Sequence, residues 1–178
     1  IIMNGDSNKW QSFYWRQFRF VQLSFRNLIG ELTIKNIYAI ECEYPFEKLG
    51  SFESSVDELN DIWDMTENTI KLCTYDNFMD NGLREKQPWT GDITAIVLGT
   101  SAIFGDDPVI RRYFFTNLNG QRNSGLLPGH WPETSVKAHS IDKDGNILWF
   151  EHPMALLLRL SAYYMYGGHK DFVESFSS

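Results

Sequence analysis

Hydrophobic and polar residues follow two different periods along the chain, and the first is typical of β-structure. Within residues 13–42, apolar side chains alternate in part over 18–25 and recur over 32–40, with a turn signal at 27–30 between them. This pattern predicts strands, because successive side chains of a strand point to opposite faces. Two strands alone bury too little surface to be stable, so they would need further sheet that the chain does not obviously contain.

From Pro45 onward the hydrophobic period becomes helical. Ser55 and Glu58 have the spacing of a capping box and precede apolar residues at helical intervals. Those positions are Leu59, Ile62, Trp63, Thr66, Ile70 and Cys73. Residues 75–91 have no regular period and are rich in turn-forming residues, so they predict a loop.

Further helices are predicted after this loop. They cover residues 93–104, 107–118, 153–166 and 171–176, with a long loop over 119–148. We expect Asp92 to cap the first of them, Gly105 to end it, and Gly167 and Gly168 to end the third. Because the first and third are apolar on nearly all sides, each should be buried on all sides. The few helices of this chain cannot surround both, so we expect part of a larger helical assembly, unfinished at both ends.

Composition narrows the function classes. Hydrophobic residues make up 43% and charged residues 22%, as in soluble globular proteins. A net charge of −7 with no basic patch argues against nucleic-acid binding. The most apolar windows, 93–104 and 154–166, are shorter than the roughly 20 residues of a membrane span, so we expect no membrane insertion.

Neither a metal nor a cofactor is expected. The cysteines, Cys42 and Cys73, are too few for a disulfide framework or a zinc site and do not settle the compartment. The histidines lack metal-ligand spacing. They are His130, His139, His152 and His169.

The densest group of chemically active residue types lies between Asp80 and Asp92. This non-periodic stretch holds three carboxylates, an arginine, a lysine and a tryptophan, and it leads into a buried helix. Hydrolysis of a glycosidic bond needs a protonated carboxyl and a second carboxylate, and neighbouring carboxylates can keep one of them protonated. A structural interpretation stays open: Asp92 can be a helix cap, and Arg84 with Glu85 a surface ion pair.

The stretch resembles the signature of bacterial α-L-rhamnosidases, Asp-Cys-Pro-x-Arg-Glu-Arg-x-x-Trp-x-Gly-Asp. The matching positions are Asp80, Arg84, Glu85, Trp89, Gly91 and Asp92. Softer similarities lie at 18–23, 59–63 and 156–168, and His169 stands where the family usually has Asp. The resemblance implies a mainly α fold, part of an (α/α)6 barrel, preceded by strands of a β-sandwich. Residues 1–44 would be the last strands and a linker, and 45–178 the first part of the catalytic barrel.

The resemblance also implies roles for individual side chains. Glu85 would be the general acid, Asp80 and Asp92 would bind rhamnose hydroxyls and tune the acid, Arg84 would orient the site, and Trp89 would pack against the sugar. Asn81-Gly82 replaces the family's Cys-Pro, and Lys86 replaces its second arginine. The family's general base lies much further toward the C-terminus, and no residue of this chain matches it.

Two more tryptophans are weaker candidates for substrate binding. Trp131 and Trp149 lie in or beside the long loop and could line the same cleft, although packing roles suit both.

These features predict a glycoside hydrolase that removes terminal α-L-rhamnosyl groups from glycosides or polysaccharides with inversion. Two alternatives stay open. One is another (α/α)6-barrel glycosidase or a lyase, and the other is a non-catalytic sugar-binding or structural fragment that lacks the base.

Overall fold

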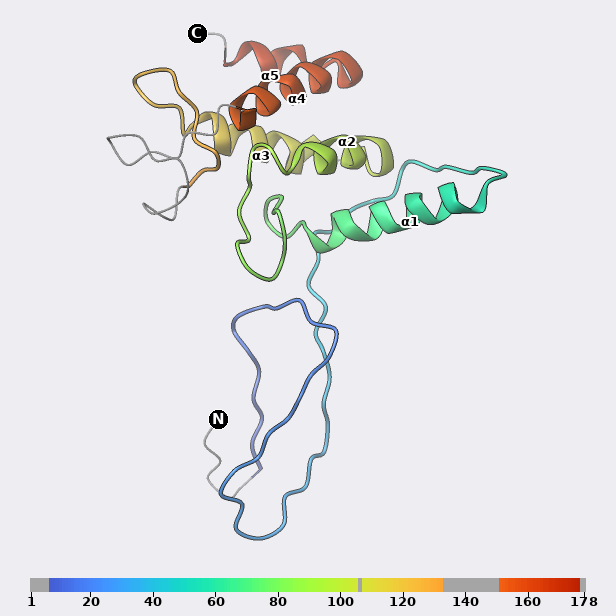
Figure 1. Ribbon diagram of the computed structural model, residues 1–178, viewed down its shortest axis with the longest axis vertical. Coiled ribbons are helices and arrows are strands. Elements are labelled where there is room, and N and C mark those ends of the chain that lie inside the picture. The colour runs from blue at the N-terminus through green and yellow to red at the C-terminus, as the bar shows by residue number, and fades with distance from the viewer. Residues whose placement is uncertain (1–6, 106, 133–150, 177–178) are drawn as a thin grey trace. The chain divides into compact units, whose positions relative to one another are not determined.

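The computed structural model describes residues 7–105, 107–132 and 151–176, and it divides into two units, residues 1–42 and 43–178. The described part of the second unit is built from helices (Figure 1). They are α1 (Asp57–Leu72), α2 (Thr94–Ile103), α3 (Asp107–Leu118), α4 (Glu151–Gly167) and α5 (Lys170–Glu174). The mainly α prediction is confirmed.

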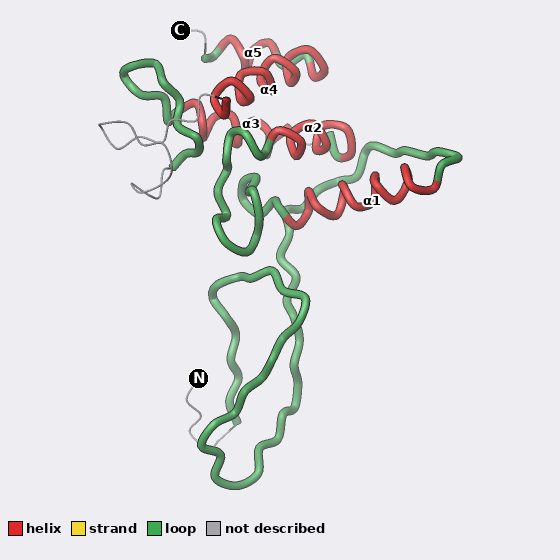
Figure 2. Tube along the Cα trace, in the orientation of Figure 1, coloured by secondary structure: helices red, strands yellow, loops and turns green. Residues whose placement is uncertain are grey.

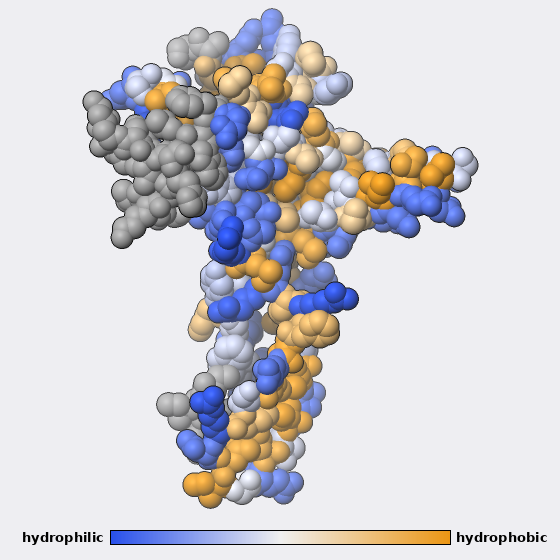
Figure 3. Space-filling model, in the orientation of Figure 1, coloured by the Kyte–Doolittle hydropathy of each residue, from blue (hydrophilic) through white to orange (hydrophobic). Residues whose placement is uncertain are grey.

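The first unit corrects one prediction. Residues 7–42 contain no strand (Figure 2). The prediction of strands within residues 13–42, all of which the structure describes, is therefore wrong. Hydrophobic residues lie on the surface of this unit (Figure 3), with Phe13 107%, Phe20 85% and Ile29 102% exposed. A strand is stabilised by a paired neighbour and by a buried face. An alternating pattern without either does not make a sheet.

The start of α1 differs from the predicted capping box. Val56 is the extended residue before the helix, and no side chain caps it. A side chain instead binds the backbone just before the helix. The Ser54 amide donates to Asn60 Oδ1 at 2.9 Å, and Asn60 Nδ2 donates back to the Ser54 carbonyl at 2.9 Å. Asn60 therefore holds the backbone before the helix, while the capping contacts expected from Ser55 and Glu58 are not formed.

The predicted glycine stops are confirmed at two helix ends. Gly105 has a φ of +61°, and its amide donates to the Thr100 carbonyl at 3.0 Å. Gly168, with a φ of +67°, donates to the Tyr164 carbonyl at 2.9 Å beyond α4. Both use the left-handed conformation that glycine adopts without steric cost.

Asp92 does not cap α2, contrary to the prediction. No side chain caps this helix, and Ile93 precedes it in helical conformation. The Ile93 amide donates to the Trp89 carbonyl at 3.1 Å, and the Thr94 amide to the Gly91 carbonyl at 3.3 Å. The turn before the helix thus satisfies these donors and leaves the Asp92 carboxylate for another role.

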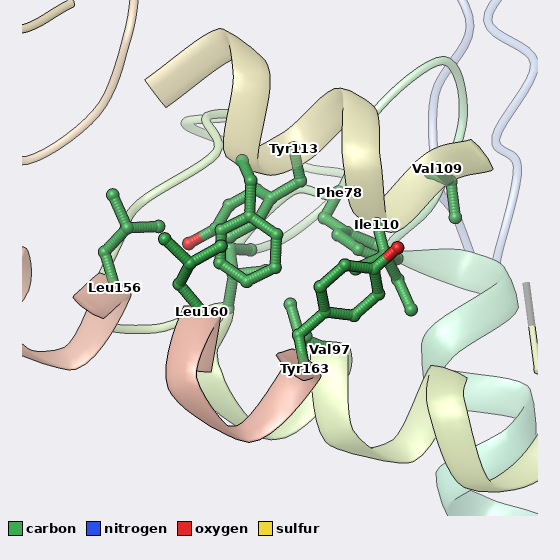
Figure 4. Close-up of a cluster of buried hydrophobic side chains, with 10 residues drawn as sticks. Phe78, Val97, Val109, Ile110, Tyr113, Leu156, Leu160 and Tyr163 are labelled. Atoms are coloured by element: carbon green, nitrogen blue, oxygen red, sulfur yellow. The ribbon is translucent and has the colours of Figure 1, made fainter. Parts of the chain in front are cut away.

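One hydrophobic core joins α2, α3 and α4, and Figure 4 shows Val97, Tyr113 and Tyr163 meeting in it from three helices. Its buried members are Phe78, Ile93, Val97, Val109, Ile110, Tyr113, Phe114, Leu156, Leu160 and Tyr163. Phe78 and Ile93 are 0% exposed and lie on either side of the loop that was predicted to carry chemistry. The core therefore fixes both ends of that loop.

A smaller cluster holds α1 against α2. Ile70 of α1 packs with Ile103 and Phe104, and the Phe46 ring stacks on Phe104 with a centroid distance of 4.2 Å. Both helices that flank the loop between α1 and α2 are therefore held in place by packing.

The two most apolar helices are not buried on all sides in the described structure. On α4, Leu156 is 0% exposed, whereas Leu158 is 64% and Met165 67% exposed. Within the described residues, no helix combines the length and hydrophobicity needed to cross a bilayer.

Candidate active site

The loop that follows α1 is built on a buried turn. The Met79 amide donates to the Cys73 carbonyl at 2.8 Å, and Thr74 pairs with Phe78 in an isolated antiparallel bridge. With Phe78 in the core, the backbone of Asp80 leaves this turn in a fixed direction.

Asp80 and Gln87 close the next part of the loop. The Asp80 amide donates to the Gln87 carbonyl at 3.0 Å, and the Gln87 amide donates to Asp80 Oδ1 at 2.9 Å. Between them, Asn81 Oδ1 accepts the amides of Leu83 at 3.1 Å and Arg84 at 2.8 Å. The loop is therefore shaped by its own polar side chains, as is typical of turn-forming Asp and Asn.

Lys86 bends the backbone of this loop. Its φ is +57°, in the left-handed region that non-glycine residues rarely adopt. The bend turns the chain from Glu85 back toward Asp80, which allows the Gln87 amide to reach the Asp80 carboxylate.

The loop brings two predicted carboxyl groups together. The side chains of Asp80 and Glu85 lie near enough for Glu85 to influence the protonation of Asp80. Burial raises the pKa of Asp80 above its ordinary value of 3.8, and Glu85 acts in the same direction, while the Gln87 amide opposes the shift. Burial and the nearby Glu85 thus favour the protonated form of Asp80.

Glu85 has two further partners, one on each oxygen. Trp89 Nε1 donates to Glu85 Oε2 at 2.7 Å, and Arg84 Nη2 donates to Oε1. The Arg84 side chain is 81% exposed and that of Glu85 33% exposed. The carboxyl group is therefore reachable from solvent and yet held from the protein side.

Trp89 lies in a compact cage. The residue is only 7% exposed, and its ring meets the ring of His130 edge to face with centroids 4.3 Å apart. A second histidine, His152 of α4, meets it at 90° with centroids 5.9 Å apart. Gly129 lies so close that a Cβ there would be 3.1 Å from Trp89 Cζ3.

Thr90 ties this cage to the long loop. Its amide and its Oγ1 both donate to the Gly129 carbonyl, at 2.8 and 2.9 Å, from a residue that is 0% exposed. His130 Nδ1 lies 2.9 Å from the Pro132 carbonyl. Segments about 40 residues apart thereby meet at Trp89, so the 119–132 loop positions the candidate site.

Three predicted site residues remain to be placed: Asp92, Trp131 and Trp149. Asp92 is exposed, and its charge adds to the burial that raises the pKa of Tyr113 well above its ordinary range. The Trp131 amide donates to Asn117 Oδ1 at 3.1 Å, and its ring lies against Gly120 beyond the end of α3. Trp149 lies outside the described residues.

The sequence did not predict that the rings of His130 and His152 contact Trp89. The pairing depends on contacts between distant parts of the chain, and a lone histidine is more often a packing residue than a site residue. The sequence offers one local signal, a glycine beside Trp89 and another beside His130. Both glycines leave room for these contacts: a Cβ at Gly91 would lie 2.5 Å from His152 Cδ2, and Gly129 faces Trp89.

Two other kinds of site were considered. Within the described part of the chain, no group of three His, Cys, Asp or Glu residues has the arrangement of a metal site. An apolar groove of about 220 Å³ lies along α1 and α2 and includes Phe52, Trp63 and Gly99. None of the predicted site residues lines it.

Comparisons with known proteins agree with the fold. No curated protein matches the chain. Among solved structures, the GH78 family rhamnosidase of Bacillus sp. GL1 matches with a TM-score of 0.61 and 22% sequence identity. The match covers 73% of this chain and 13% of that protein, so the chain spans a small part of the length of the enzyme it resembles.

The sequence profile described as the bacterial alpha-L-rhamnosidase 6 hairpin glycosidase domain matches residues 47–177, most of the chain and all of the described helices. On this match, the chain belongs to the bacterial α-L-rhamnosidase six-hairpin glycosidase family.

Proposed function

We propose that the protein to which this chain belongs hydrolyses terminal α-L-rhamnosyl groups, with Glu85 as the general acid. The observation that carries the proposal is the pair of neighbouring carboxyl groups, Asp80 and Glu85, in which burial and the nearby Glu85 raise the pKa of Asp80. A glycosidase requires such a proton donor beside the leaving oxygen. The 33% exposure of the Glu85 side chain gives a substrate access to it.

In this mechanism Glu85 donates its proton to the glycosidic oxygen as the bond from that oxygen to the anomeric carbon breaks. Asp80 is proposed to support the acid, because two neighbouring carboxyl groups disfavour a second negative charge. Arg84 orients the carboxyl through Oε1. Asp92, Trp131 and Trp149 are proposed as sugar contacts.

Asp80 is unsuited to be the general base of an inverting enzyme. Inversion needs a carboxyl separation of about 6.5–9.5 Å, which leaves room for the attacking water. Asp80 lies beside Glu85 in the same short loop, near enough to influence its neighbour directly, which is closer than that separation. We therefore propose a base outside the 80–92 loop, toward the C-terminus as the family resemblance implies.

The proposed domain organisation follows from the same resemblance. Residues 45–178 would form the first part of the catalytic barrel, which agrees with the profile match over 47–177. Residues 1–44 would connect to a preceding β-sandwich.

The test is an assay of the full-length protein on 4-nitrophenyl α-L-rhamnopyranoside beside the corresponding glucoside, galactoside and arabinoside. We expect cleavage of the rhamnoside alone, with the β-anomer of rhamnose appearing first in a proton NMR time course. A first-formed α-anomer would contradict inversion. Preference for another glycoside, an unsaturated product or binding without turnover would favour the other barrel enzymes, a lyase or a sugar-binding protein, respectively.

A further inference from the structure

We propose that Trp89 is a positioning residue that holds Glu85 through its indole N–H, in addition to any contact it makes with sugar. The inference rests on the proposed function of Glu85 as the acid. Its basis is the 2.7 Å hydrogen bond from Trp89 Nε1 to Glu85 Oε2, made by a ring that is itself fixed.

The Trp89 ring is held from several directions. His130 and His152 meet it edge to face, and Gly129 lies against its six-membered ring. The next residue, Thr90, makes two hydrogen bonds to the Gly129 carbonyl. A ring confined in this way presents its N–H in one direction at little further entropic cost.

Glu85 benefits from such a restraint because its partner Arg84 holds it weakly and its neighbour Asp80 is another carboxyl group. The side chain has three rotatable bonds, and its Arg84 partner is 81% exposed, where ion pairs hold geometry weakly. A general acid has to lie within hydrogen-bonding distance of the leaving oxygen to act. Among the partners of Glu85, the buried indole is the one whose own position is determined by packing.

The hydrogen bond also fixes how one carboxyl oxygen is used. An indole N–H can only donate, so Oε2 accepts from Trp89 while Oε1 accepts from Arg84. The Trp89 contact therefore fixes the direction of the carboxyl group from the buried side.

This role is distinguishable from sugar stacking. Stacking uses an open ring face, and Trp89 exposes 7% of its surface, whereas positioning uses the N–H. Replacement of the N–H without loss of the ring separates the two roles.

The experiment compares wild-type full-length protein with Trp89→Phe and with a variant that carries 3-benzothienylalanine at position 89, which keeps the ring size and lacks the N–H. On an alkyl α-L-rhamnoside we expect kcat to fall about tenfold to a hundredfold in both, the scale of a hydrogen bond to a charged group. KM should stay within about twofold, since the substrate contacts persist. An activated 2,4-dinitrophenyl leaving group should show a smaller loss.

Trp63→Phe is the matched control. Trp63 stacks on Phe52 with centroids 5.4 Å apart and has no role in the proposed site, so both constants should remain at wild-type values. A benzothienyl variant with wild-type kcat would overturn the inference, and a raised KM with unchanged kcat in Trp89→Phe would assign the ring to sugar binding instead.

A crystal structure of the Trp89→Phe protein separates this inference from the proposed function. We expect Glu85 to leave its present position or to occupy several. If Glu85 stays in place, the positioning role is wrong even where the enzyme is a rhamnosidase. A wild-type protein inactive on every rhamnoside would overturn the proposed function, while a displaced Glu85 would still support the positioning contact.

Discussion

Asp80 and Gln87 hold each other across the loop before α2 by two hydrogen bonds, one from each backbone amide. The Gln87 amide reaches the Asp80 carboxylate at 2.9 Å, and the Asp80 amide reaches the Gln87 carbonyl at 3.0 Å. Asp80 thus stabilises the loop through these hydrogen bonds and also lies beside the proposed acid, Glu85. Its two roles respond differently to substitution.

Asp80→Asn should stabilise the fold at neutral pH while it lowers activity. Burial raises the folded-state pKa of Asp80, so the native protein binds more protons than the unfolded chain above pH 3.8. Stability from this group therefore falls as pH rises through the raised pKa. Asn keeps an acceptor for the Gln87 amide and removes the cost of burying the charge.

Thermal denaturation across the acid range checks this. The gain in Tm should be present at neutral pH and absent below pH 3.8. A Tm that falls at neutral pH would show that the carboxylate stabilises the loop more than its burial costs.

Lys86→Gly and Lys86→Val form a matched pair for the bend of the loop. At a φ of +57°, glycine relieves about 1–2 kcal/mol of strain and loses about 0.5–1 kcal/mol to chain entropy, so Lys86→Gly should be close to neutral. Valine is β-branched and disfavours this conformation, so Lys86→Val should lower both Tm and kcat. Equal behaviour of the two variants would mean that the bend is not required.

Gly91→Ala should destabilise the protein by about 1–3 kcal/mol, the usual cost of overpacking. A Cβ at this position would lie 2.5 Å from His152 Cδ2, so α4 or the Trp89 cage would have to shift. Unfolding measurements on Gly91→Ala, His152→Ala and the double variant test the contact. The double variant should recover part of the loss, and strictly additive losses would contradict the steric explanation.

The exposed face of α4 should make the 178-residue chain associate when it is studied alone. Met154, Leu158 and Met165 are each more than 60% exposed, and apolar patches of this kind favour association. We expect the isolated chain to bind a hydrophobic dye and to elute above its monomer mass of 20.7 kDa. Leu158→Lys should reduce both effects, and a monomeric wild-type chain without dye binding would contradict the prediction.

The sequence predicted helix ends best where one residue determines the backbone. Gly105 and Gly168 end α2 and α4 because their positive φ is a local property. The start of α1 was predicted less well, because Ser55 and Glu58 have the favoured spacing but form no cap, and Asn60 instead contacts the Ser54 backbone. Spacing alone does not determine which of two nearby polar side chains reaches the backbone.

Long-range features were less predictable. The alternating residues within 13–42 carry a strand pattern, but strand formation depends on partners that a pattern does not reveal. The loop signature identified Asp80 and Glu85, whereas the cage of His130 and His152 around Trp89 arises from contacts across 40 residues or more. Local sequence encodes the chemistry of the site, and tertiary packing determines which groups hold it.

The most direct test of the account is the leaving-group dependence of Glu85→Gln in the full-length protein. If Glu85 is the general acid, kcat on an alkyl α-L-rhamnoside should fall by about 10²–10⁴, the usual scale of general-acid help. The loss should be much smaller with an activated phenol, which leaves without full protonation, and the alkaline limb of the pH–rate profile should flatten. Asp92→Asn is the comparison, since it removes a proposed sugar contact and should not change the leaving-group dependence. Equal losses of Glu85→Gln on both substrates, with the alkaline limb intact, would contradict the account.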